Sequence, residues 1–209
     1  WWGGVAPESF VKAVYAVDKN ATINLRVNSP GGSVFAARAM EQALRAHKGK
    51  VVVHIDGLAA SAATFVSMAG DEIVMAKGAM FMIHKAWTGM WGNAEDLRKE
   101  ADLLDKIDGT LAETYADKTG KDIAAITEWM AAETWFTAQE ALDAGFATSI
   151  AEAEAKALAW DLSAYSNAPK AERQTQPEPA PTPEPEPTAS DEHRDRQQQR
   201  LRVLSLLTA

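Results

Sequence analysis

The sequence contains no cysteine among its 209 residues. This absence excludes a disulfide framework, a thiolate nucleophile and any zinc or iron–sulfur site with cysteine ligands. No run of 18 apolar residues occurs either, so the sequence predicts no transmembrane helix and no membrane partner. Residues 1–4 lack the basic and apolar stretches of a signal peptide and an initiator methionine, which leads us to expect a fragment or a processed form.

Motifs for metal and nucleotide binding are also missing. None of the four histidines belongs to an HExxH or similar metal-ligand spacing, and neither GxGxxG nor the Gly-Lys-Ser/Thr of a P-loop occurs. We therefore expect no metal and no cofactor. The formal charge is −8, with 29 acidic and 21 basic residues, which argues against nucleic acid as the main partner.

Proline is concentrated near the C-terminus, where seven of the nine prolines fall between Asn167 and Ser190 among Glu, Thr and Ala. Such a composition buries too little apolar surface to offset its ordering entropy, so we predict a disordered linker over residues 167–190. Residues 191–209 are predicted to form a short C-terminal helix, either a partner-binding or oligomer-forming segment or a truncated remnant. The folded domain is predicted to cover residues 1–166.

Within this domain, segments with helical periodicity alternate with strand-like segments. Helices are predicted over residues 10–17, 34–46, 61–70, 94–118, 122–132 and 138–144, and strands over residues 22–27, 51–55, 71–75, 79–84 and 134–137. Asn93 with Asp96 three residues later suits the start of the long helix, and Gly120 suits its end. The alternation predicts an α/β fold with a largely parallel sheet.

Three local features could carry chemistry. The first is Asn28-Ser29-Pro30-Gly31-Gly32-Ser33, placed between a predicted strand and a predicted helix. Its glycines allow backbone N–H groups at the helix start to converge on an anion, as in an oxyanion hole or a phosphate cradle, although an ordinary tight turn fits the same residues.

The second and third features are Ser61 and His84. Small residues on both sides of Ser61 allow a sharp turn from strand to helix that presents its hydroxyl, while a simple closely packed helix is the alternative. His84 closes an apolar run, where an imidazole of near-neutral pKa could act as a general base or serve only structure.

Taken in order, these features resemble a known family. Asn-Ser-Pro-Gly-Gly, then Ala-Ala-Ser and then Met-Ile-His are similar to the motifs of ClpP-type serine peptidases, and more closely to the ClpP-related head maturation proteases of tailed bacteriophages. The resemblance extends to residues 136–146 and spans roughly residues 10–150. It implies the ClpP/crotonase-like fold of repeated ββα units.

The resemblance also implies roles for particular residues. Ser61 would be the nucleophile, His84 its general base, and the N–H groups of Gly32 and Ala62 the oxyanion hole. The family has an Asp at the position of the third triad member, where this sequence has Glu133. A Glu can do the same work, and a Ser–His dyad or Asp143 are the alternatives.

The implied function is a serine endopeptidase that forms homo-oligomers, acts on protein or peptide substrates and needs no cofactor. For the phage subfamily the substrates would be capsid or scaffold proteins, cleaved in the cytoplasm of a bacterial host or inside the immature head. Two other functions remain open, a crotonase-fold acyl-CoA enzyme and a non-enzymatic assembly or scaffolding protein.

Overall fold

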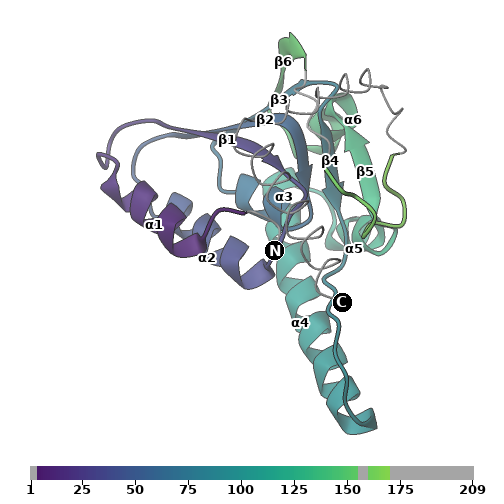
Figure 1. The fold of residues 1–209 in the computed structure, drawn as a ribbon. Coiled ribbons are helices and arrows are strands. Elements are labelled where there is room, and N and C mark those ends of the chain that lie inside the picture. The colour runs from purple at the N-terminus through teal and green to yellow at the C-terminus, as the bar shows by residue number, and fades with distance from the viewer. Residues whose placement is uncertain (1–3, 155–159, 170–209) are drawn as a thin grey trace, which may run out of the picture. The chain divides into compact units, whose positions relative to one another are not determined.

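The computed structural model describes residues 4–154 and 160–169. The first of two compact units spans Trp1–Pro169. Most of the predicted linker and all of the predicted C-terminal helix lie outside the described residues. In the described part, the predicted α/β fold is confirmed, with a mixed sheet flanked by helices (Figure 1).

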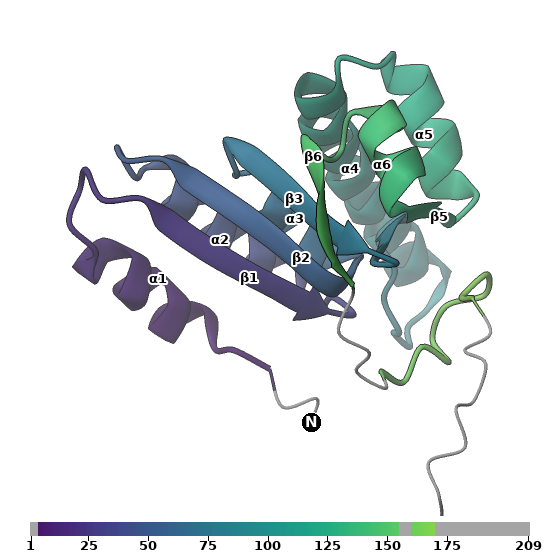
Figure 2. The same cartoon turned by 90° about the horizontal axis from the view of Figure 1, so that it is seen from above.

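The strands form one six-stranded sheet in the order β5-β4-β2-β3-β6, and β1 also pairs with β2. They are β1 (Ile23–Ser29), β2 (Val51–Ala60), β3 (Glu72–Lys77), β4 (Met80–Ile83), β5 (Thr134–Thr137) and β6 (Ser149–Glu154). All paired strands run parallel except β4 and β5. Figure 2 shows β1, β2 and β3 side by side.

The second strand is the organising element of this sheet. Its first half pairs with β3 at residues 52–55, and its last three residues, Leu58–Ala60, pair with β4. The sheet therefore changes partner near Gly57 and curls. The sequence predicted this strand only to residue 55, because the small residues that follow have low strand propensity and are held extended by tertiary pairing.

The helices are α1 (Pro7–Ala16), α2 (Val34–Arg45), α3 (Ala62–Ser67), α4 (Ala94–Thr119), α5 (Ile123–Ala131) and α6 (Ala138–Ala144). The predicted caps of α4 are present, since Asn93 and Asp96 form a capping box and Gly120 ends the helix in the left-handed conformation. The N-terminal half of α4 extends away from the sheet (Figure 1). Among the described residues, no helix is long and apolar enough to cross a membrane.

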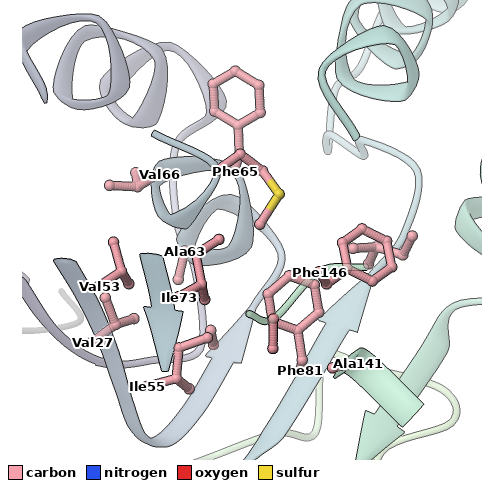
Figure 3. Packing of buried hydrophobic residues seen from close by; sticks show 14 of the residues in the cluster. Val27, Val53, Ile55, Ala63, Phe65, Val66, Ile73, Phe81, Ala141 and Phe146 are labelled. Atoms are coloured by element: carbon pink, nitrogen blue, oxygen red, sulfur yellow. The ribbon is translucent and has the colours of Figure 1, made fainter. Parts of the chain in front are cut away.

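The core lies between the sheet and the helices packed on it (Figure 3). Phe81 of β4 stacks on Phe146 with ring centroids 4.9 Å apart, and Phe65 of α3 is fully buried. Full burial of a side chain of this size contributes roughly 1.5–3 kcal/mol. This core fixes β4 and α3 relative to each other, and both elements border Ser61 and His84.

Candidate active site

Ser61 stands at the turn between β2 and α3. Its φ of 53° and ψ of −126° form a conformation that non-glycine residues rarely adopt. Its N–H donates to the carbonyl of Met82 at 2.9 Å, which ties the turn to β4. Because the hydroxyl makes no capping bond to α3, it is free to face another group. A strained residue held this firmly marks a candidate functional position.

His84 is that other group. It follows β4 directly, and the parallel register of β4 with β2 places the carboxyl ends of both strands together. The His84 Nε2 atom lies 2.8 Å from the Ser61 Oγ atom. Burial lowers the pKa of His84 below its usual value, and the negative charge of Glu133 partly offsets this. At neutral pH the imidazole is therefore uncharged and able to accept the serine proton.

Glu133 stands beside this pair. It precedes β5, and the antiparallel register that pairs Ile83 with Thr134 brings it next to His84. Its φ of 49° is again positive. Among the described residues, its carboxylate accepts hydrogen bonds from Trp135, Ser166 and Asn167 rather than from His84. The link that the structure describes between Glu133 and the imidazole is thus electrostatic.

Asp143, the alternative third member, lies on the exposed face of α6, where its Oδ1 accepts a hydrogen bond from Gln139 at 2.9 Å. The structure therefore brings together Ser61, His84 and Glu133, while Asp143 is engaged on the helix surface. A triad with Glu133 stays a prediction.

The two predicted oxyanion-hole residues also adjoin Ser61. Ala62 is the first residue of α3, so its N–H has no partner within the helix. Gly32 follows β1 and stands just before α2, with open space where a Cβ would be. In the described part of the chain, neither N–H has a hydrogen-bond partner. Both are therefore available to an anionic oxygen.

Gly31 holds the predicted oxyanion loop against the Ser61 turn. Its φ is +108°, and a Cβ added there would lie 2.8 Å from both the Ala60 oxygen and the Ser61 Cβ. We expect Gly31→Ala to lower both activity and the free energy of unfolding, the latter by about 1–3 kcal/mol. Gly109→Ala is the matched control, because Gly109 lies in α4 with open space around it and should gain about 0.5–1 kcal/mol. Urea denaturation measures both, and an equally stable Gly31→Ala would contradict the tight packing.

A series of buried hydrogen bonds connects α4 to the backbone of Ser61. Tyr115 of α4 is almost fully buried, and its hydroxyl lies 2.7 Å from the Thr64 Oγ1 atom. Thr64 donates in turn to the Ser61 carbonyl at 2.5 Å. Burial raises the pKa of Tyr115, so this hydroxyl stays protonated. The sequence placed Tyr115 only on the apolar stripe of a helix, and no local signal identifies its partner.

A cavity opens beside Ser61. Apart from Ser61, His84 and Tyr115, its lining is apolar: Val34, Ala37, Ala62, Phe65, Ala86 and Leu111. The start of the loop after His84 is fixed by Asp108, which accepts a hydrogen bond from the Ala86 N–H at 2.7 Å. In the described residues, no cluster of His, Asp and Glu could hold a metal ion. The arrangement suits acyl transfer to a serine.

Comparison with known proteins agrees with this chemistry. The Clp protease family model matches residues 8–154. The ATP-dependent Clp protease proteolytic subunit 1 of Leifsonia xyli subsp. xyli (strain CTCB07) is 34% identical over 139 residues, covering 66% of this chain and 71% of that protein. Subunit 2 of Rhodococcus jostii (strain RHA1) is 34% identical over 149 residues, covering 68% of this chain and 74% of the relative. The chain belongs to the Clp protease family and is a serine peptidase.

Proposed function

We propose that the chain is an endopeptidase in which Ser61 is the nucleophile and His84 the general base. The observation that carries the proposal is the 2.8 Å contact between Ser61 Oγ and His84 Nε2 at a turn where Ser61 has a positive φ. The family match favours this function over an acyl-CoA enzyme or a non-enzymatic assembly protein.

The reaction follows from this geometry. Ser61 Oγ bonds to the scissile carbonyl carbon while its proton passes to His84 Nε2. The carbonyl oxygen becomes an oxyanion that accepts hydrogen bonds from the N–H groups of Gly32 and Ala62. The C–N bond then breaks and the departing amine takes the proton from His84. A water molecule repeats these steps on the acyl-enzyme and restores the serine.

Glu133 is proposed to assist electrostatically. Its negative charge raises the pKa of His84 and stabilises the imidazolium that forms during the reaction. The apolar lining beside Ser61 favours a small apolar side chain on the acyl side of the scissile bond.

The partners are proposed from the family and from the surface of the molecule. The N-terminal half of α4 and the loop before it expose Trp91, Leu97 and Leu103, at 99%, 48% and 41%. Apolar side chains on a helix that extends from the sheet suit association with further copies of the chain, so we propose a homo-oligomer.

The natural substrates are proposed to be capsid or scaffold proteins of a tailed bacteriophage, cleaved in the bacterial cytoplasm or within the immature head. The support is the resemblance of the motif series, Asn-Ser-Pro-Gly-Gly, Ala-Ala-Ser and Met-Ile-His, to the phage branch of the family.

Fluorophosphonate labelling tests the proposed nucleophile, because the reagent forms a stable adduct only with an activated serine hydroxyl. We expect one adduct per chain, on Ser61, and a labelling rate at least about a hundredfold lower in His84→Ala, where the base is missing. Peptide mapping locates the adduct. An adduct on another serine, or equal rates in the two proteins, would refute the assignment.

A further inference from the structure

Residues 160–167, here named the C-terminal strap, follow β6 in the sequence and lie at the active site. Their contacts reach far back along the sequence: Trp160 donates through Nε1 to the Asn28 Oδ1 atom at 2.9 Å, and the Tyr165 hydroxyl donates to the Pro30 carbonyl. Asn28 lies near the end of β1, and Pro30 lies in the turn after this strand that carries the proposed oxyanion hole. The strap therefore lies across the entrance to the site rather than on a remote surface.

Tyr165 is the residue of the strap closest to the chemistry. Its ring stands edge-on to the His84 ring, with centroids 5.3 Å apart and an interplanar angle of 86°. It also packs on Trp135 at 5.9 Å. Burial raises the pKa of Tyr165, and the neighbouring Ser61 hydroxyl partly counteracts this. The Tyr165 side chain thus packs beside the Ser61–His84 pair.

An apolar surface beneath the strap receives its side chains. Leu58, Ala60 and Met82 are buried at the junction of β2 and β4, and Met80 and Trp135 pack around them. Leu162 and Tyr165 complete this cluster from the strap. The yellow-green segment in Figure 1 runs beside β4 and β5 accordingly.

The backbone of the strap is held by Glu133. The N–H of Ser166 donates to Glu133 Oε2 at 2.9 Å, and the N–H of Asn167 donates to Oε1 at 2.6 Å. Asn167 also donates through its side chain to the Ala132 carbonyl at 2.8 Å. Charge-assisted bonds of this kind are stronger than neutral ones. The strap thus engages the same carboxylate that influences the pKa of His84.

The contacts of the strap favour the leaving-group side of the scissile bond as its place. The cavity beside Ser61, which we assigned to the acyl side, is lined by residues of α2, α3 and α4 together with Ser61, His84 and Ala86, and no strap residue lines it. The leaving amine must pass His84, because His84 Nε2 supplies its proton. Tyr165 packs against this same imidazole, so a leaving group that reaches His84 meets the Tyr165 ring.

We propose that the leaving-group side of the cleft is a binding site for an extended peptide segment with an aromatic residue, and that the strap is its intramolecular occupant. This inference rests on the proposed function. A substrate that continues past the scissile bond must displace the strap, so its apparent affinity is reduced by the fraction of molecules in which the strap is released. A substrate that ends in a small leaving group does not need the whole site.

The test uses the full-length protein and two fluorogenic substrates. The short peptide carries an aminocoumarin directly after the scissile bond, and the long, internally quenched peptide has four residues beyond that bond. Tyr165→Ala should raise kcat/KM for the long peptide about tenfold, mainly through a lower KM, and change the short one less. Tyr165→Phe, which keeps the ring and loses the bond to Pro30, should give a smaller rise. Tyr15→Ala is the control, because Tyr15 is an exposed residue of α1.

The proposal would be overturned if kcat/KM for the long peptide fell or stayed unchanged in both Tyr165 variants, provided that fluorophosphonate still labels Ser61 in them. Failure of fluorophosphonate to label Ser61 in any of the proteins would instead overturn the proposed function and this inference with it.

Hydrogen exchange tests the competition directly. In Ser61→Ala, which binds the long peptide without cleaving it, the amides of Ser166 and Asn167 should exchange slowly alone and at least about tenfold faster with the peptide bound. Unchanged protection with the peptide bound at saturation would show that peptide and strap occupy different places, and the proposal would be wrong.

Discussion

Ser61→Ala should lower kcat for peptide hydrolysis by about 10⁴-fold or more, because the oxygen that forms the acyl-enzyme is removed. The fold should persist, since the hydroxyl makes no capping bond and its contact in the structure is with His84. The loss of that single hydrogen bond should change the free energy of unfolding by about 1 kcal/mol or less. Initial rates on a fluorogenic peptide, together with urea denaturation, measure both effects.

Ser67→Ala is the matched control for this variant. Ser67 is the last residue of α3, the helix that Ser61 precedes. It is fully buried and donates to the Ala63 carbonyl at 2.8 Å, so its hydroxyl does not reach His84. Its replacement should leave the rate within a few-fold of wild type. Wild-type turnover by Ser61→Ala, after a contaminating protease has been excluded by fluorophosphonate treatment, would contradict the role of Ser61. Coexpression with capsid or scaffold protein extends the same comparison to the proposed substrates.

The parts of the site that the sequence predicted are those encoded in short contiguous segments. Pro30 and Gly31 specify a turn whichever strand precedes them, and small residues around Ser61 permit its unusual backbone. His84 was a candidate because an apolar run ended in an imidazole. Such candidate residues can be predicted from a short segment without knowledge of the fold. The 2.8 Å distance between Ser61 Oγ and His84 Nε2, in contrast, depends on the register of β2 with β4.

Other parts depend on contacts between distant residues. The strap residues Trp160 and Tyr165 reach partners 132 and 135 positions earlier in the chain, and they lie in an irregular segment without helix or strand periodicity. Strand β6 was missed because its alternating alanine and glutamate residues have low strand propensity and it is held by pairing with β3. The positions of the strap and of β6 are therefore set by tertiary contacts rather than by local sequence.

Glu133 either completes a catalytic triad or stands beside a Ser61–His84 dyad, and the pH dependence of catalysis separates these two mechanisms. His84 must be neutral to act as a base, so kcat/KM falls as the pH drops through its pKa. Burial lowers that pKa, which places the acid limb below the value of about 6.5 for free imidazole. The charge of Glu133 works in the opposite direction and raises the pKa.

Removing that charge in Glu133→Gln should therefore move the acid limb of kcat/KM to lower pH, while kcat falls roughly tenfold to a thousandfold because the imidazolium loses its stabilising neighbour. His84→Ala should lose more, about 10⁴-fold, because the base itself is missing. The profile is measured on the short peptide, for which the strap competes least. Asp143→Asn on the surface of α6 is the control and should change neither kcat nor the acid limb of kcat/KM. A Glu133→Gln profile that coincides with wild type in both rate and acid limb would identify a Ser61–His84 dyad, whereas a loss as complete as that of His84→Ala would make Glu133 an indispensable member of a triad.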